Sequence, residues 1–220
     1  MKKYLRAYTC LLGLGLLLLA STAKAQPPQE TGDFKKTDLV ELVKIVPYVK
    51  LDIRYATANN FTHRPVYTQA RAFLQRPAAE ALINVSKALK PMGYGLLVFD
   101  GYRPWAVTKI FWDITPDSNK RFVANPQKGS RHNRGCAVDL SLYDLKTGKE
   151  IKMPGVYDEM TERSYPDYKG GTEQQRKTRD LLRRVMEANG FKVNEFEWWH
   201  FDYKEWPLYT ITNVPFEDLK

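Results

Sequence analysis

Two short motifs contain three side chains of the kinds that bind transition metals. Residues 130–139 read SRHNRGCAVD and contain His132 and Asp139, seven positions apart with a glycine between them. Residues 197–200 read EWWH and add a second histidine, His200. Catalytic zinc usually has three protein ligands and one open position for water, whereas structural zinc is closed by four. The motifs therefore predict one catalytic Zn²⁺ per chain, held by His132, Asp139 and His200.

Glu197 lies three residues before the second histidine and could supply the acid–base group that this chemistry needs. A bound zinc ion lowers the pKa of its water toward about 7, and Glu197 would accept that proton and pass it to the leaving amine. On a regular strand, residues three apart point to opposite faces, and the aromatic composition of this segment disfavours a helix. We therefore expect an irregular chain at residues 198–199 that turns Glu197 and His200 toward one metal.

Arg103 is the best candidate for a fixed positive charge beside the developing oxyanion. It lies in the GYRP sequence of residues 101–104, directly after an apolar segment. A surface ion pair is the alternative role for this arginine. Two further side chains of metal-binding type favour a structural reading. Cys136 lies between two small residues and suits a packed position, and His63 has no other ligand type at a metal-like spacing nearby.

The first 25 residues have the pattern of a secretory signal peptide. A basic start precedes a leucine-rich run at residues 10–20, and residues 23–25 read AKA, which is a small-residue cleavage pattern. The apolar run is too short for a membrane span, and a retained membrane anchor is the alternative. We predict an exported protein, periplasmic or secreted, with no stable membrane insertion after cleavage.

The remaining 195 residues are enough for one domain with a real core. Cleavage would remove four positive charges and no negative one, which lowers the net charge from +9 to about +5. This modest, scattered excess does not indicate a nucleic-acid partner. One cysteine is left, so no disulfide can form within the mature chain. Residues 26–36, which are polar and contain two prolines, are predicted to be a flexible leader, and residues 37–220 a single catalytic domain. The oligomeric state stays open.

Hydrophobic periodicity predicts the elements that position these side chains. Helical spacing and stop signals predict helices at residues 77–90, 105–114 and 172–190, the last with a capping box at Thr172. Apolar and alternating segments predict strands at residues 49–55, 95–99, 137–142 and 196–203. Helices and strands interleave without strict β-α-β order. This pattern predicts an α+β domain with a central, mainly antiparallel sheet, flanking helices and the zinc site on the sheet.

The combined motifs resemble the zinc D-alanyl-D-alanine dipeptidases of the vancomycin-resistance type. The motifs that carry the resemblance are S-x-H-x-x-G-x-A-x-D at residues 130–139, E-x-x-H at 197–200 and G-Y-R-P at 101–104. Residues 52–61, 64–67 and 157–164 are also similar to segments of that family, so the likeness runs from about residue 40 to about residue 208. The metal motif alone is shared with D,D-carboxypeptidases and hedgehog-like domains.

The resemblance implies a small, enclosed site that cleaves the free dipeptide D-Ala-D-Ala to two D-alanines. It implies the same roles for the three metal ligands, Glu197 and Arg103, and it adds two substrate-binding residues. Asp158 would meet the ammonium of the dipeptide and Ser130 would orient it. From the sequence alone, Asp158 could equally be a turn residue. An exported chain departs from the cytosolic resistance enzymes, which favours disposal of cell-wall fragments, or nutrition, over precursor depletion.

Two other functions stay open. A D,D-carboxypeptidase or murein endopeptidase would combine the same metal site with an open groove for longer peptides. A catalytically silent zinc module would bind cell-wall peptide without cleaving it. The presence of both Glu197 and Arg103 argues against the silent module, because a protein that only binds peptide needs neither side chain.

Overall fold

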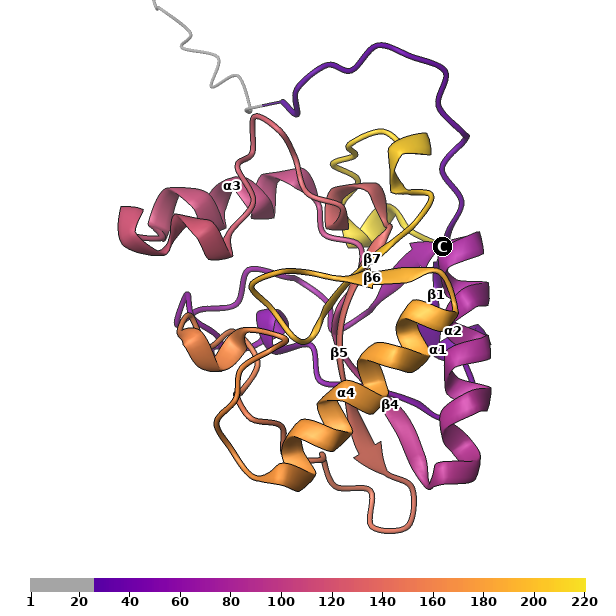
Figure 1. Ribbon diagram of the computed structural model, residues 1–220. Helices are drawn as coiled ribbons and strands as arrows, with labels where there is room; N and C mark the ends of the chain where they lie inside the picture. Colours follow the sequence, from indigo (N-terminus) through magenta and orange to yellow (C-terminus); the bar gives the residue numbers. More distant parts are fainter. Residues whose placement is uncertain (1–25) are drawn as a thin grey trace, which may run out of the picture.

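A five-stranded sheet forms the centre of the fold (Figure 1). The computed structural model describes residues 26–220, so the predicted signal peptide lies outside the described residues. The sheet has the strand order β2-β4-β5-β7-β6. Its strands are β2 (Val49–Leu51), β4 (Tyr94–Asp100), β5 (Ala137–Asp144), β6 (Phe191–Val193) and β7 (His200–Tyr203). The β2–β4 pair is parallel and the other three pairs are antiparallel.

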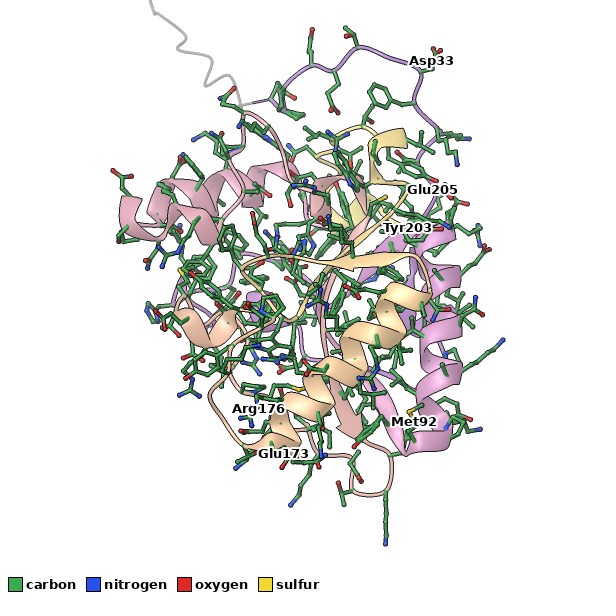
Figure 2. The ribbon with its side chains drawn as sticks, in the orientation of Figure 1. Asp33, Met92, Glu173, Arg176, Tyr203 and Glu205 are labelled. Carbon is green, nitrogen blue, oxygen red and sulfur yellow. The ribbon has the colours of Figure 1, made fainter. Side chains whose placement is uncertain are left out.

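Within residues 26–220, a small antiparallel sheet of β1 (Leu39–Glu41) and β3 (Phe73–Gln75) and four α-helices surround this sheet. The helices are α1 (Leu42–Ile45), α2 (Arg76–Leu89), α3 (Trp105–Ile114) and α4 (Glu173–Ala188). Helices α2 and α4 contact each other; α2 also contacts β4, and α4 contacts β6. Figure 2 shows Glu173 and Arg176 at the outer, N-terminal end of α4. The predicted α+β class, with one domain and a mainly antiparallel sheet, is confirmed.

The predicted helices agree with the observed ones to within two residues at each end. The capping box of α4 is present, since the Thr172 hydroxyl accepts from the Gln175 amide and the Gln175 side chain accepts from the Thr172 amide. The strand predicted at residues 49–55 was too long. After β2 the chain turns into a short 3₁₀ helix, Arg54–Ala56, because the amide of Arg54 bonds the carbonyl of Asp52 instead of a neighbouring strand.

Strand β5 lies in the middle of the sheet, between β4 and β7. Every residue from 137 to 143 is buried, because each face of the strand is covered. A strand in this position cannot shift without moving its whole set of side chains to the other face, so its register is strongly specified. The side chains of β5 are therefore fixed relative to both neighbouring strands.

The strand register brings three ionisable residues into one row. Asp139 of β5 lies directly opposite His200 of β7 and opposite Asp100 of β4. Directly opposed residues of neighbouring strands project from the same face of a sheet. The β4–β5 ladder is irregular between Val98 and Asp100, at the end of β4 that leads to the GYRP segment.

Two glycines let the loops around this row approach the rest of the backbone closely. Gly135 has a positive φ of 66°, and a Cβ there would lie 2.4 Å from Cδ2 of Leu39. At Gly101 a Cβ would lie 2.6 Å from the carbonyl oxygen of Phe73. At Gly101 a side chain would push the loop away from the backbone of β3. At Gly135 the positive φ itself disfavours other residues, and the Leu39 side chain would also have to move.

Residues 26–36 contain no helix or strand. They nevertheless contact the domain, because the amide of Lys35 donates to the carbonyl of Leu208 and Glu30 forms an ion pair with Arg134. The predicted flexibility of this segment in solution stays a prediction. Within residues 26–220, every helix is too short or too polar to cross a lipid bilayer.

Candidate active site

The three predicted metal ligands converge on the sheet. His132 lies in the 3₁₀ turn η4 (His132–Arg134) just before β5, Asp139 lies within β5, and His200 begins β7. His132 Nε2 is 3.1 Å from His200 Nδ1 and 3.4 Å from Asp139 Oδ1, and His200 Nδ1 is 3.1 Å from the same oxygen. Among the described residues, these three side chains form the group whose ligand atoms lie close enough together to hold a metal ion.

The size of this triangle fits a tetrahedral zinc ion. Zinc binds imidazole nitrogen and carboxylate oxygen at about 2.0–2.1 Å, and a tetrahedron with such bonds separates its ligand atoms by about 3.3 Å. The observed separations of 3.1, 3.4 and 3.1 Å agree with that value. Asp139 Oδ1 is buried and makes no hydrogen bond to any described residue. A buried, unbonded carboxylate oxygen between two imidazoles is a site that a cation would stabilise.

The second nitrogen of each histidine is held by a hydrogen-bond acceptor. His132 Nδ1 lies 2.7 Å from the carbonyl oxygen of Gly101, and His200 Nε2 lies 2.9 Å from Asp202 Oδ1. A carbonyl or carboxylate oxygen can only accept, so each of these nitrogens carries the hydrogen. His132 Nε2 and His200 Nδ1, the two atoms of the triangle, are then the nitrogens available to a metal. This arrangement orients both rings, as is usual around protein-bound zinc.

The charges of the ligand group compensate one another. Burial by itself would raise the pKa of Asp139, but the two neighbouring histidines outweigh it and hold that pKa below its usual range. Burial would lower the pKa of His200, but Asp202 and Asp139 outweigh it and hold the pKa well above the usual value for histidine. A metal ion bound between these groups would compensate the negative charge of Asp139 in the same way.

Glu197 lies beside the three candidate metal ligands. Its Oε2 lies 3.7 Å from His200 Nδ1. The expected irregular chain is present, since residues 198 and 199 form a turn and the amide of His200 donates to the carbonyl of Glu197 at 3.3 Å. This turn allows two residues three apart to point into the same cavity. Burial raises the pKa of the Glu197 carboxyl, and the positive charge of His200 opposes this rise.

Arg103 is buried and held by a carboxylate from the same segment. Its Nε and one terminal nitrogen donate to Asp100 Oδ2 at 2.9 and 2.7 Å, and that terminal nitrogen is 3.7 Å from Asp139 Oδ2. Asp100 Oδ1 accepts from the hydroxyl of Tyr67 at 2.8 Å. Arg103 is therefore not a surface ion pair but a buried, oriented cation beside the candidate metal ligands.

Asp158 and Ser130 line the same cavity as the metal ligands. The hydroxyl of Tyr55 donates to Asp158 Oδ1 at 2.9 Å, whereas the buried Oδ2 has no hydrogen-bond partner among the described residues. Burial, and next to it the charge of Asp139, raises the pKa of Asp158 to about 7. The Ser130 hydroxyl accepts from the amide of His132 at 3.2 Å.

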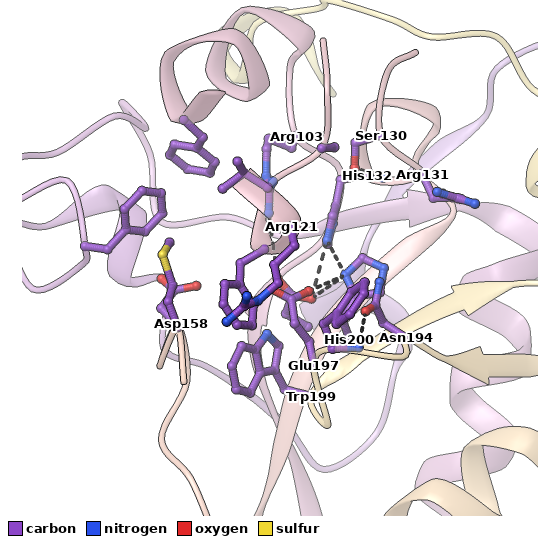
Figure 3. A pocket seen from close by; sticks show the side chains of 18 of the residues that line it. Arg103, Arg121, Ser130, Arg131, His132, Asp158, Asn194, Glu197, Trp199 and His200 are labelled. Carbon is purple, nitrogen blue, oxygen red and sulfur yellow. Dashed lines mark hydrogen bonds and ion pairs between the residues drawn. The ribbon is translucent and has the colours of Figure 1, made fainter. Parts of the chain in front are cut away.

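The cavity has a volume of about 250 Å³. Figure 3 shows how side chains from distant parts of the chain surround it, with Arg103, Ser130, Asp158, Arg121, Trp199 and the ligand histidines among those labelled. Phe61 and Phe111 contribute apolar walls. The site thus combines a polar floor at the sheet with partly apolar sides, which suits a small ligand that carries charged groups.

Cys136 and His63 lie outside the ligand group. Cys136 is buried, and burial raises the pKa of its thiol to about 12, so it remains an uncharged packing residue. His63 is exposed and has a positive φ of 56° in a loop. The structural readings favoured for both residues agree with these positions.

Sequence reasoning missed three residues that hold the site together: Asp100, Asp202 and Tyr157. Asp100 orients Arg103, Asp202 orients His200, and the Tyr157 hydroxyl donates to Asp139 Oδ2 at 3.2 Å. A signal existed for Asp202, because residues two apart on a strand share a face and it follows His200 by two. No comparable signal linked Tyr157 to Asp139.

Comparison with known proteins identifies relatives along most of the chain. A family model described as D-ala-D-ala dipeptidase matches residues 35–217. A D-alanyl-D-alanine dipeptidase of Escherichia coli (strain K12) is 34% identical over 175 residues, which are 80% of this chain and 89% of that protein. One from Enterococcus faecalis is 36% identical over 171 residues, which are 70% of this chain and 85% of that protein.

Among solved structures, the LdcB LD-carboxypeptidase is similar to 79% of this chain and 71% of its own, with a TM-score of 0.45 and 21% sequence identity. A likeness at this level says nothing about activity.

We expect Asp202→Asn to weaken zinc binding by about tenfold to a hundredfold, because His200 would lose the charged acceptor that orients its ring. Competition with a chromophoric chelator measures the dissociation constant. Asp218→Asn, which neutralises an exposed carboxylate near residue 220, is the matched control. Equal zinc affinity of Asp202→Asn and the parent would contradict the orienting role of Asp202.

Proposed function

Because the chain belongs to the D-ala-D-ala dipeptidase family, we propose that it hydrolyses the free dipeptide D-Ala-D-Ala to two D-alanines with one zinc ion. Membership of this family makes the chain a metal-dependent peptidase. The single observation that carries the proposal is the triangle of ligand atoms with the Glu197 carboxylate beside it in one small cavity. The relatives that match most of the chain are named for this dipeptide.

His132, Asp139 and His200 would hold the ion. Two imidazoles and one carboxylate form a donor set that catalytic zinc accepts, with a position left for substrate or water. When bound, zinc supplies a Lewis acid that makes water more acidic and polarises the carbonyl of the scissile peptide bond.

Glu197 would move the proton. A carboxylate whose pKa is raised by burial is suited both to accept a proton from the attacking water and to donate it to the leaving amine. The distance of 3.7 Å between its Oε2 and Nδ1 of His200 supports this role.

Arg103 would stabilise the negative charge that develops on the carbonyl oxygen. Its guanidinium is buried and already oriented by Asp100, so little reorganisation is needed when the charge forms. The positive charge of Arg103 is compensated by Asp100 before substrate binds, so the buried pair has no net charge.

Asp158 and Ser130 would bind the dipeptide itself. The ammonium group of a free dipeptide would donate a hydrogen bond to Oδ2 of Asp158, which has no partner among the described residues. Its positive charge would also favour the ionised form of this carboxyl, whose pKa is otherwise raised to about 7. The Ser130 hydroxyl, next to His132, would orient the other part of the substrate. A site that uses the free ammonium selects the dipeptide over longer peptides, which lack that charge at this position.

We expect the zinc-loaded protein to release D-alanine from D-Ala-D-Ala, with kcat/KM about 10–100-fold lower for N-acetyl-D-Ala-D-Ala. The acetylated analogue has the same peptide bond but would leave Asp158 unpaired, at a cost of about 1–3 kcal/mol. A D-alanine assay on both compounds and on a muropeptide that ends in D-Ala-D-Ala measures this selectivity. Preferred cleavage of the muropeptide would instead indicate a carboxypeptidase or endopeptidase. If the protein binds the muropeptide but cleaves none of the three compounds, the result would indicate the silent module.

We expect Glu197→Gln to lower kcat by about 10²–10⁴, because the amide cannot accept the proton. Its zinc content, measured by elemental analysis, should match that of the parent, since Glu197 is not one of the three ligands. Glu187→Gln changes an exposed glutamate of α4 in the same way and serves as the control. Full activity of Glu197→Gln would refute the assignment of the base.

We also propose that residues 1–25 are removed on export, so that the mature chain consists of residues 26–36 and a catalytic domain of residues 37–220 in the periplasm or the medium. The leader pattern of the sequence supports this division, and the family match over residues 35–217 falls within the mature chain. Fractionation and N-terminal sequencing of the natural protein should give a start at Gln26. A protein found in the cytoplasm with an intact Met1 would contradict export.

A further inference from the structure

Arg134 is a buried cation next to the metal site. It ends the turn η4, two residues after His132, and only 7% of its surface is exposed. Its backbone carbonyl accepts from Gln75, and its guanidinium donates to the carbonyl of Tyr209. Burial makes a guanidinium unfavourable unless a carboxylate compensates it. The partner of Arg134 is therefore important for the conformation of this turn.

That partner comes from the N-terminal segment. Glu30 Oε1 accepts from one terminal nitrogen of Arg134 at 2.5 Å, and Oε2 lies 3.4 Å from the other. Oε2 also accepts from the amide of Ile211 at 2.7 Å. Within residues 26–220, Glu30 is the carboxylate that forms an ion pair with Arg134. One side chain of the segment 26–36 thus connects the turn η4 to the C-terminal segment.

The remaining contacts of η4 show why this connection matters for His132. The carbonyl of His132 accepts from the amide of Arg103, and the carbonyl of Asn133 accepts from the amide of Thr212. The turn is short, so its position depends on such contacts with other segments rather than on its own hydrogen bonds. Loss of the Glu30 contact would leave the buried Arg134 guanidinium without its carboxylate at one end of the turn that carries His132.

A tryptophan links the same ion pair to the second metal histidine. The ring of Trp206 lies 5.4 Å from the guanidinium carbon of Arg134 and 4.6 Å from that of Arg131. Arg131 in turn lies 3.5 Å from Oδ2 of Asp202, whose other oxygen bonds His200. Both guanidinium groups thus lie over the ring of Trp206, within the range of a cation–π interaction.

From these contacts we infer that Glu30 is a positioning residue for the metal site and that residues 26–36 form a strap, not a free leader. Glu30 of the strap compensates the positive charge of Arg134 and fixes the turn η4, which orients His132. This inference rests on the metal site of the proposed function, but it makes no use of the substrate. It also explains why a segment without helix or strand remains in contact with the domain.

Glu30→Gln in the mature chain is expected to raise the zinc dissociation constant by about tenfold or more, in the range seen when support of a zinc ligand is lost. It is also expected to alter the visible spectrum of the Co²⁺-substituted protein, which reports ligand geometry. Asp33→Asn is the matched control, because it removes one negative charge from the same segment, where Asp33 is exposed at the outer side of the strap (Figure 2). The control should keep the zinc affinity and cobalt spectrum of the parent.

Parental zinc affinity and an unchanged cobalt spectrum in Glu30→Gln would overturn the inference. If Glu30→Gln does not fold, Glu30→Asp decides, since it keeps the charge but shortens the reach. Weaker zinc binding at an unchanged melting temperature supports positioning, and parental affinity overturns it. Both readouts are made without substrate. A parent that binds zinc but cleaves no dipeptide would therefore refute the proposed activity and leave this test intact.

Discussion

The pairing of β5 with β7 is the interaction on which the candidate site depends. It sets Asp139 directly opposite His200 on one face of the sheet, and the β4–β5 pairing adds Asp100 to the same row. A shift of one residue would turn Asp139 to the other face. The burial of β5 between two strands opposes such a shift, so the apolar core that stabilises the fold also fixes the ligand geometry. His132, on the turn before β5, is then the ligand that needs support from elsewhere.

Several carboxylates of the site are buried close to one another. Burial is the main cause that raises the pKa values of Glu197 and Asp158, whereas the two histidines beside Asp139 lower its pKa against the effect of burial. Arg103 compensates Asp100, and three tyrosine hydroxyls donate to acidic side chains of the group. A divalent cation would add positive charge at the centre of this group. Metal binding should therefore also stabilise the folded chain.

Predictability from the sequence differed among the parts of the fold. The helices at residues 76–89 and 105–114 have strong periodicity and clear ends, so their predictions were close. The strand expected at 49–55 ended early, because a local turn at Arg54 replaced strand pairing. The irregular chain before His200 was foreseen because no regular strand can point Glu197 and His200 the same way. Its form, a turn at residues 198–199, came from contacts that the sequence does not display.

The sequence by itself determined the kinds of side chain at the site and the motif spacing, because ligand chemistry depends on residue type and each motif is local. The seven residues singled out for metal, catalysis and substrate all line or flank one cavity, and their roles stay predictions. Only the tertiary structure decided that Asp100 holds Arg103, that Tyr157 bonds Asp139 and that Glu30 reaches Arg134. Hydrogen-bond partners of this kind are set by direction and burial after the chain has folded. Residues more than 100 positions apart, such as Glu30 and Arg134, carry no periodic signal that could reveal their contact.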